Sequence, residues 1–264
     1  MTMPMINFGG RSEGAVFEPH HGQSLGAVVI CHERYGLVQH TLDLAERLSA
    51  DGYLAVAPDF LSHWDGDKEA VKRGDLDVDV EDEIVQEHLL AAKDFVSKNY
   101  VIEPQRTAVM GVCMSGSYPF LAADVIPGLG AAVVFYGGAG DDDVSGDRQR
   151  PYSEILPKMT CPVLGVWGED DHVISFDQVK RLRNMLEGEK ISYEFTIYPR
   201  MPHGWLNSTM PGRYRPREAE QAWAQLISFI GRAFAGEFEP QRQTASFICS
   251  VSRDYDFSRK VRLA

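Results

Sequence analysis

Apolar runs rich in β-branched residues alternate along this chain with longer amphipathic stretches. The apolar runs have the length and composition of buried strands. They occupy residues 27–31, 53–57, 107–112, 131–136, 162–167 and 192–198. The amphipathic stretches repeat apolar side chains three or four positions apart, as on one face of a helix. They occupy residues 37–51, 80–98, 115–124, 176–187 and 217–234.

Strands that alternate with helices in this way become parallel neighbours joined by helical crossovers. We therefore expect an α/β fold in which a mostly parallel central sheet carries helices on both faces. Asp79 is expected to cap the helix that follows the acidic, irregular segment 60–79. Ligands of such sheets bind at the carboxyl ends of the strands, so candidate chemistry is expected there.

Composition narrows the class of partner. The chain has 264 residues and a formal net charge of −12, which argues against nucleic acid or an anionic membrane as a partner. No apolar run approaches the ~18 residues of a membrane span, and the N-terminus lacks the pattern of a secretory signal. Acidic side chains concentrate at 59–83 and 141–147, which we expect to be solvated surface.

The four cysteines, Cys31, Cys113, Cys161 and Cys249, are widely scattered. Their spacing has neither the pairing of metal ligands nor the density of a disulfide framework. We expect a reducing cytoplasmic location, which would keep Cys113 usable as a thiol. The other three cysteines are expected to be inert.

The strand at 107–112 runs into a sharp turn with Cys113 at its apex. Gly111 precedes the cysteine, and Ser115 and Gly116 follow it, so neighbouring backbone can approach the turn closely. An α/β-hydrolase presents its nucleophile on such a turn between a strand and a helix. A thiol at this place predicts nucleophilic catalysis, provided that a nearby group holds or generates the thiolate.

Two further strand ends carry the partners that a cysteine nucleophile needs. Asp171 follows the fifth predicted strand, and His203 follows the sixth. The order nucleophile, acid, histidine is the one expected of an α/β-hydrolase. We expect His203 to move the proton between Cys113 and the leaving group, while Asp171 fixes the imidazole tautomer. The backbone N–H groups of Met114 and Arg34 are expected to receive the developing oxyanion.

A carboxylate, Glu33, follows the first predicted strand, where burial of an unpaired charge is costly. With it, the chain resembles the dienelactone hydrolase family over roughly residues 10–235. The matching segments are Glu33-Arg34-Tyr35-Gly36, Gly111-Val-Cys-Met-Ser-Gly116, Gly168-Glu-Asp-Asp171 and His203-Gly204. Most α/β-hydrolases have serine at the apex and no such acid, so the cysteine and the glutamate make the resemblance specific.

The resemblance implies a hydrolase that cleaves a lactone or another activated carboxylic ester through an acyl-cysteine, with no metal and no organic cofactor. It also implies that Glu33 lies beside the Cys113 thiol and accepts its proton when substrate arrives. The partner would be a small-molecule ester or lactone. Arg34, Tyr35 and Trp205 are candidate substrate-binding residues, with surface or packing roles as the alternative.

Three departures from the family pattern bear on the substrate. Ser115 stands where the family usually has glycine, and Arg34 replaces a commonly apolar residue near the mouth of the pocket. Where the family has an arginine for the substrate carboxylate, this chain has Leu206-Asn207-Ser208. We therefore expect a substrate other than a small dienelactone, with an anionic or electron-rich group near Arg34, Lys72 or Arg73.

Three other functions stay open on the residues alone. They are a broader carboxylesterase or thioesterase, an acyl transferase whose pocket excludes water, and a non-catalytic ligand-binding protein on a hydrolase scaffold. The complete set Cys113, Asp171, His203 and Glu33 speaks against the last, since a retired site should have lost a member.

The chain divides into an expected hydrolase domain, 1–235, and a C-terminal extension, 236–264. Apolar side chains alternate at Phe247, Cys249 and Val251, which predicts an added strand. So apolar a segment is not typical of disorder. We expect the extension to pack on the body of the chain or across a homodimer interface.

Overall fold

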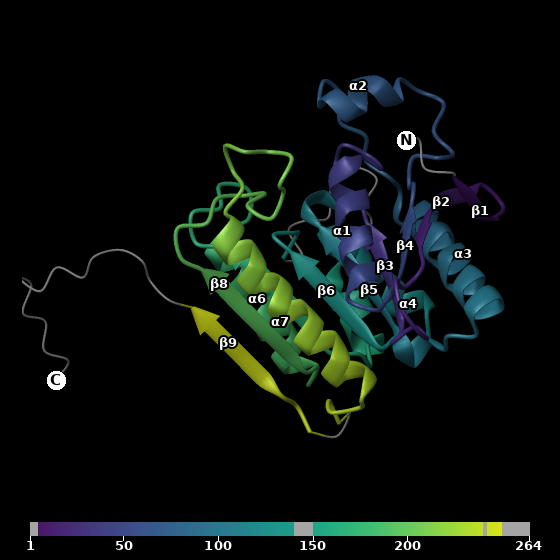
Figure 1. The fold of residues 1–264 in the computed structure, drawn as a ribbon. Coiled ribbons are helices and arrows are strands. Elements are labelled where there is room, and N and C mark those ends of the chain that lie inside the picture. The colour runs from purple at the N-terminus through teal and green to yellow at the C-terminus, as the bar shows by residue number, and fades with distance from the viewer. Residues whose placement is uncertain (1–4, 140–149, 240–241, 250–264) are drawn as a thin grey trace, which may run out of the picture.

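The computed structural model describes residues 5–139, 150–239 and 242–249 of the chain (Figure 1). Its strands form one sheet in the order β1-β2-β4-β3-β5-β6-β7-β8-β9. β1 pairs antiparallel with β2, and β2 pairs antiparallel with β4. Every other pairing in the sheet is parallel. The strands are β1 (Ile6–Gly9), β2 (Ser12–Phe17), β3 (Ala27–Cys31), β4 (Leu54–Pro58), β5 (Thr107–Val112), β6 (Ala131–Phe135), β7 (Val163–Gly168), β8 (Tyr193–Tyr198) and β9 (Ala245–Cys249).

Helices cover both faces of this sheet, which confirms the predicted architecture (Figure 1). α1 and α7 lie on one face, where Arg47 of α1 pairs with Glu220 of α7. α3 and α4 pack together on the other face. The helices are α1 (Gln39–Ala50), α2 (Lys68–Arg73), α3 (Asp82–Tyr100), α4 (Tyr118–Val125), α5 (Tyr152–Ile155), α6 (Phe176–Gly188) and α7 (Pro216–Phe234), with short 3₁₀ turns η1 (Pro104–Arg106), η2 (Cys113–Ser117) and η4 (Leu156–Lys158).

The structure adds two elements that the sequence pattern does not predict. The β1–β2 hairpin extends the sheet at the N-terminal edge. β1 has only four residues, and β2 begins with Ser-Glu-Gly, so neither forms an apolar run that stands out in the pattern. Helix α2 lies within the segment 60–79 that was expected to be irregular. Asp67 begins it by accepting a hydrogen bond from the backbone N–H of Ala70, and Gly74 ends it with φ +78°.

The predicted cap of α3 at Asp79 is wrong. The helix begins at Asp82, and its N-cap residue is Glu81, whose side chain makes no capping hydrogen bond. Val80 is buried in the core, so the chain reaches the helix start in an extended conformation with Glu81 at ψ 140°. Burial of an apolar side chain here decides the boundary instead of a polar cap.

The C-terminal extension contributes a strand to the sheet of the same chain. β9 pairs in parallel with β8, with Phe247 opposite Phe195. The ring of Phe247 also lies 6.0 Å from that of Phe176 in α6. Residues 250–264, including Val251 of the predicted strand, and the acidic stretch 141–147 lie outside the described residues.

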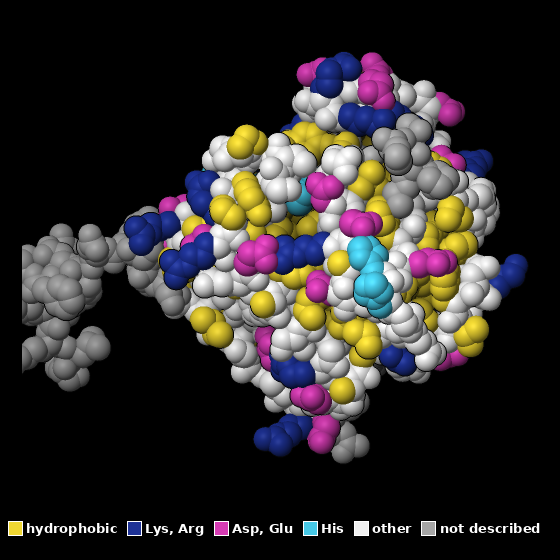
Figure 2. Space-filling model, viewed as in Figure 1, with side chains coloured by type: hydrophobic (Ala, Val, Ile, Leu, Met, Phe, Trp, Pro, Cys, Tyr) yellow, Lys and Arg dark blue, Asp and Glu magenta, His cyan; other side chains and the backbone are white. Residues whose placement is uncertain are grey.

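The core lies on both faces of the central strands. Every residue of β3, β4, β5, β6 and β7 is buried, as expected for parallel strands covered by helices. On the face shown in Figure 2, acidic and basic side chains are interspersed and hydrophobic side chains are scattered between them. The buried sheet thus gives a rigid frame for the side chains that follow its strands.

Candidate active site

Cys113 occupies the sharp turn between β5 and α4. Its φ is +57°, a left-handed conformation that a non-glycine residue adopts only at a cost of order 1–3 kcal/mol. The 3₁₀ turn η2 begins at Cys113 itself and leads directly into α4. This turn leaves the cysteine half-buried at the carboxyl end of β5, where the α/β arrangement places ligand sites.

Close backbone contacts explain the two glycines that flank this turn. A Cβ at Gly111 would lie 2.0 Å from the backbone oxygen of Ser115, and a Cβ at Gly116 would lie 2.2 Å from Cα of Gly137. Neither position can hold a side chain without moving backbone. The close approach predicted for the turn is therefore present on both sides of Cys113.

Ser115, which departs from the family pattern, ties the turn to the neighbouring strand. Its hydroxyl accepts a hydrogen bond from the backbone N–H of Val112 at 2.9 Å. It lies equally close, at 2.9 Å, to the carbonyl oxygen of Cys31 at the end of β3, to which it can donate. A glycine would make neither bond, so the serine holds the β3 and β5 ends together.

Cys113, His203 and Asp171 form a connected chain of polar contacts. Nε2 of His203 lies 3.0 Å from Sγ of Cys113. Nδ1 of the same ring lies 2.9 Å from Oδ2 and 3.1 Å from Oδ1 of Asp171. The Asp171 side chain is fully buried, and its Oδ1 also accepts from the backbone N–H groups of Val173 and Ile174. The aspartate is therefore held in place while it orients the imidazole.

The surroundings of His203 favour its protonated form. Burial by itself would lower the pKa of the imidazole. The hydrogen bonds to Asp171 and Cys113, together with their charges, outweigh burial and raise the pKa to about 10. A protonated imidazole at this place can donate its Nε2 proton to a leaving group.

Glu33 is hydrogen-bonded to a residue that the resemblance does not name. Its side chain is buried, and Oε2 accepts a hydrogen bond of 2.8 Å from Nδ2 of Asn207. The hydrogen-bonding partner of the Cys113 sulfur is instead His203. Burial raises the pKa of Glu33 to about 7, although the Asn207 hydrogen bond and the charges of His203 and Arg213 oppose the rise. Glu33 is thus a buried carboxyl that titrates near neutrality within the electrostatic reach of His203.

Asn207 is a site residue that the sequence reasoning missed. Its Oδ1 accepts hydrogen bonds from the backbone N–H of Thr209 at 3.0 Å and from the Thr209 hydroxyl at 2.6 Å. With the oxygen held in this way, the amide nitrogen must face Glu33. The available signal was its place in Leu206-Asn207-Ser208, where the resemblance leads one to expect an arginine.

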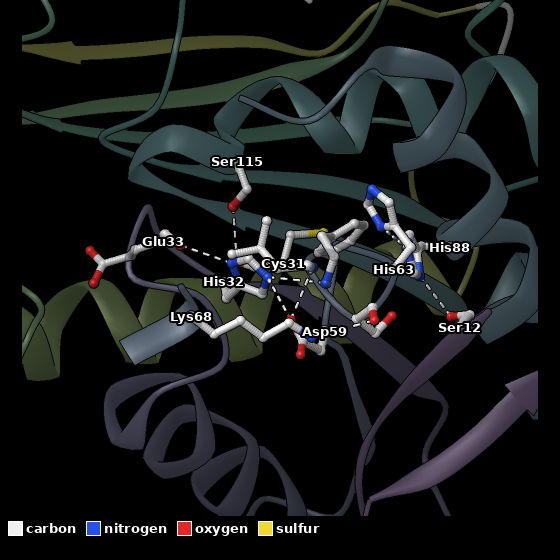
Figure 3. Close-up of polar contacts among 12 residues, drawn as sticks. Ser12, Cys31, His32, Glu33, Asp59, His63, Lys68, His88 and Ser115 are labelled. Atoms are coloured by element: carbon white, nitrogen blue, oxygen red, sulfur yellow. Dashed lines mark hydrogen bonds and ion pairs between the residues drawn. The ribbon is translucent and has the colours of Figure 1, made fainter. Parts of the chain in front are cut away.

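His32 holds the backbone of Glu33. Its Nε2 accepts from the backbone N–H of Phe60 at 3.1 Å, so the ring proton is on Nδ1, which donates to the carbonyl oxygen of Glu33 at 2.8 Å. Figure 3 shows the Glu33 carboxylate directed away from His32. The buried histidine therefore fixes the main chain of the loop and leaves the carboxylate free to face Asn207.

The two residues after Glu33 contact the segment around α2. The Arg34 guanidinium pairs with Asp77, donates to the carbonyl oxygen of Gly74 at 3.4 Å and lies 5.5 Å from the centre of the Tyr35 ring. The Arg34 charge is thus already neutralised. The backbone of Arg34 and that of Met114 follow neighbouring strands, because β3 and β5 pair in register from Ala27 to Cys31.

Trp205 has no exposed surface, so the position does not suit its predicted role in binding substrate. Its ring packs against Tyr198 at 5.0 Å and Tyr136 at 6.4 Å between centres. Tyr136 in turn lies edge-on to His203 at 5.2 Å. Trp205 therefore packs against Tyr136, which in turn packs against the ring of His203.

Within residues 5–139, 150–239 and 242–249, no three His, Cys, Asp or Glu side chains are grouped as metal ligands. No helix in the same ranges combines the length and the apolar composition that a membrane span requires.

The model of the dienelactone hydrolase family matches residues 13–234. A protein of Salmonella typhimurium named "Putative carboxymethylenebutenolidase" is 28% identical over 214 residues, which cover 79% of this chain and 78% of the relative. A protein of the same name from Escherichia coli K12 is 28% identical over 211 residues, covering 78% of this chain and 76% of the relative.

Solved structures share the fold. The crystal structure of a "Putative Dienelactone Hydrolase" from Klebsiella pneumoniae superposes with a TM-score of 0.71 at 24% identity, covering 84% of this chain and 92% of that one. A dienelactone hydrolase-like promiscuous phosphotriesterase from metagenomic libraries superposes with a TM-score of 0.69 at 18% identity, covering 88% and 98%. The described residues thus have the α/β-hydrolase fold that the sequence predicts.

Proposed function

Because this chain belongs to the dienelactone hydrolase family and is a hydrolase, we propose that it cleaves a lactone or an activated carboxylic ester through an acyl intermediate on Cys113. The observation that carries the proposal is the contact of 3.0 Å between Sγ of Cys113 and Nε2 of His203, with Asp171 on the far side of the ring. A nucleophile, a base and an orienting carboxylate in this order constitute a hydrolytic triad.

In the first half of the reaction, the Cys113 sulfur attacks the carbonyl carbon of the ester. The carbonyl oxygen becomes an oxyanion, which the backbone N–H groups of Met114 and Arg34 receive. As the tetrahedral intermediate collapses, the bond from carbon to the leaving oxygen breaks, and His203 gives its Nε2 proton to that oxygen. The products are an alcohol and a thioester on Cys113. For a lactone, the alcohol stays attached to the acyl group.

In the second half, a water molecule attacks the thioester carbon. Neutral His203 takes a proton from this water, and the bond from carbon to sulfur then breaks. The carboxylic acid leaves, and the sulfur and the imidazole return to their starting states. Asp171 keeps the ring in the tautomer that presents Nε2 to the reacting atoms in both halves.

Glu33 acts in this proposal as a second titrating group, which accepts the proton of the Cys113 thiol when substrate enters and returns it to the sulfur after the product leaves. Its carboxyl has a pKa of about 7, which suits a group that exchanges a proton near neutral pH. The carboxylate bonds to Asn207 through Oε2 in this structure.

In this proposal, Arg213 binds an anionic group on the substrate. The three cations first considered are each paired with an acid, Arg34 with Asp77, Lys72 with Glu69 and Arg73 with Asp75. Arg213 makes no ion pair with any described residue and contributes a charge to Glu33. A Cβ on Gly204, next to His203, would lie 3.6 Å from Cδ of Arg213. Arg213→Ala should raise KM for carboxylated esters and leave neutral esters unchanged; equal losses would remove Arg213 from this role.

A slow ester substrate tests the covalent step directly. Intact-protein mass spectrometry should show one acyl adduct, and digestion should place it on the peptide that contains Cys113. Cys113→Ala should give neither adduct nor turnover. Cys249→Ala is the matched control, because Cys249 is the exposed free cysteine in the described residues, and it should behave as the parent protein. Full turnover by Cys113→Ala would exclude the mechanism.

The location of the protein is also proposed to be the cytoplasm. Cys31, Cys113, Cys161 and Cys249 are all free in the structure, and free thiols persist in a reducing compartment.

A further inference from the structure

A cavity that is separate from the candidate active site lies between the β1–β2 hairpin and α3, at the opposite edge of the sheet from β9. Its volume is about 430 Å³, within the size range of small-molecule sites. None of Cys113, Asp171, His203 or Glu33 lines it. Its hydrophobic wall is formed by Phe8 of the hairpin together with Ile84, Leu90 and Ala91 of α3. It is therefore a separate, largely apolar cavity with its own polar groups.

The polar wall of this cavity is a chain of three hydrogen-bonded side chains (Figure 3). Ser12 Oγ lies 2.9 Å from Nδ1 of His88, and Nε2 of His88 lies 3.3 Å from Nδ1 of His63. Ser12 and His88 are buried, and all three residues line the cavity. Phe60 packs against the His88 ring at 5.5 Å between centres and holds it in place. This series of hydrogen-bonded side chains thus begins at the buried Ser12 and ends at His63.

The remaining nitrogen of His63, Nε2, makes no hydrogen bond with any residue that the structure describes. This nitrogen is therefore available to bond to a ligand. The charged residues around the cavity, Arg11, Glu87 and Asp94, are exposed, so water screens them. His88 is neutral, because burial lowers its pKa to about 4. A charged group brought inside would therefore meet no buried opposite charge.

The direction in which these hydrogen bonds are donated decides whether Nε2 of His63 is a donor or an acceptor. If Ser12 donates to His88 and His88 donates to His63, then Nε2 of His63 carries a hydrogen and donates. If the direction is reversed, the same nitrogen accepts. A hydroxyl group can both donate and accept, so it satisfies either direction. A carbonyl or an ether can only accept, and so satisfies one direction alone.

We propose that this cavity is a binding site for a small uncharged aromatic alcohol, whose ring lies against Phe8, Ile84 and Ala91 and whose hydroxyl bonds to Nε2 of His63. The apolar wall supplies the area for the ring, and the histidine supplies the single directed contact. The site is independent of the hydrolytic reaction proposed above, and it would operate in a protein without a catalytic cysteine.

The test uses the full-length protein with two probes that differ by one hydroxyl group, p-cresol and toluene. Histidine ring signals in NMR spectra of the ¹³C-histidine-labelled protein are followed during titration with each probe. We expect p-cresol to bind with a Kd on the order of 1 mM and to shift the signals of His63 and His88. Toluene should bind more weakly at the same place. Movement of the His203 signal in place of those two would overturn the proposal.

Variants separate the directed contact from simple apolar binding. His63→Phe keeps a ring but removes the nitrogen, so it should weaken p-cresol by about three- to tenfold, the worth of one hydrogen bond, and leave toluene unchanged. His20→Phe, an exposed histidine that lies outside the cavity, is the matched control and should alter neither. Ala91→Trp should fill the cavity and abolish both. Equal effects of His63→Phe on the two probes, or unchanged binding in Ala91→Trp, would refute the site.

Discussion

At the scale of single residues, the orientation of one amide controls a buried carboxyl group within electrostatic reach of His203. Thr209 donates twice to Oδ1 of Asn207, which leaves Nδ2 to donate to Glu33. A donor at this place stabilises the ionised carboxylate and opposes the effect of burial on its pKa. Asn207 is thus a positioning residue for Glu33.

Asn207→Asp should reverse the effect. A second carboxylate opposite Glu33 would disfavour its ionisation and raise its pKa further. If Glu33 must be ionised to accept the thiol proton, the acid limb of the kcat/KM profile should move up by about one pH unit. The pH dependence of kcat/KM checks this. Asn184→Asp, at an exposed position of α6, should leave the profile in place, and an unmoved profile in Asn207→Asp would contradict the role.

Glu33 also gives stability a pH dependence of predictable sign. Its folded-state pKa is raised from 4.5 to about 7, so the folded state holds the proton more tightly than the unfolded state. The contribution to the free energy of unfolding is fully present below pH 4.5 and is lost as pH rises through 7. Glu33→Gln removes this loss, so its stability relative to the parent should rise by up to about 3 kcal/mol across that window.

Urea unfolding at several pH values between 4 and 8 measures this difference. Glu83→Gln, an exposed substitution on α3, provides the reference and should run parallel to the parent protein. A constant difference between Glu33→Gln and the parent across the window would mean that the carboxyl does not titrate in the folded state as its burial requires.

The sequence could predict that Cys113, Asp171 and His203 lie together, because each comes soon after a core strand and parallel strands bring their carboxyl ends to one edge. It could not predict the partner of Glu33. Asn207 is 174 positions away in the chain, and it reaches Glu33 only through the path of the loop after β8. Nor could it predict that Asp77 neutralises Arg34, because that contact depends on where the segment after α2 lies.

At the scale of elements, the turn that carries the cysteine is held to β3 by one hydroxyl. Ser115→Ala removes the acceptor of the Val112 N–H and the donor to the Cys31 carbonyl, both buried. Leaving such groups unsatisfied should lower the free energy of unfolding by about 1–3 kcal/mol. The rate of acylation should fall as well, because the turn that carries Cys113 loses its hydrogen bond to the end of β3.

The same turn provides a control two residues later. The hydroxyl of Ser117 is buried without a hydrogen-bond partner among the described residues, so Ser117→Ala should be neutral or slightly stabilising. Denaturant unfolding of the two variants side by side makes the comparison. Equal losses would show that removal of any hydroxyl near the turn has this effect, and that the bond to β3 is not special.

Among the elements, the buried central strands were predictable and the edge of the sheet was not. β3 and β5 are almost entirely apolar, and this composition predicts that they are buried. β1 is a four-residue strand that pairs with its neighbour through a bulge, and such a strand leaves little periodic signal. Helix α2 is six residues long and depends on its Asp67 cap and its Gly74 terminus more than on an apolar stripe.

At the scale of the whole molecule, the last strand closes one side of the sheet. A chain that ends at Glu239 would lack β9 and leave the backbone of β8 unpaired along its length. It would also uncover Phe195 and Phe176, whose rings contact Phe247. We expect the melting temperature to fall by about 3–10 °C and the open edge to promote aggregation.

Differential scanning calorimetry and light scattering test this prediction. A chain ending at Cys249 retains β9 and serves as the control, so its melting temperature should stay near that of the full chain. Light scattering of the full chain also tests the proposal that the extension holds two subunits together. An unchanged melting temperature after removal of β9 would show that the strand contributes nothing to the body.

The distance of 90 positions between Cys113 and His203 has a consequence for how the protein is made. At a synthesis rate of about 5–20 residues per second, the cysteine leaves the ribosome on the order of 10 s before its histidine exists. The β8 strand that positions His203 follows in the same late interval, and Asn207 comes later still. A nascent or truncated chain therefore lacks the His203 partner of Cys113, and under the proposed mechanism the protein becomes active only once nearly the whole domain has been synthesised.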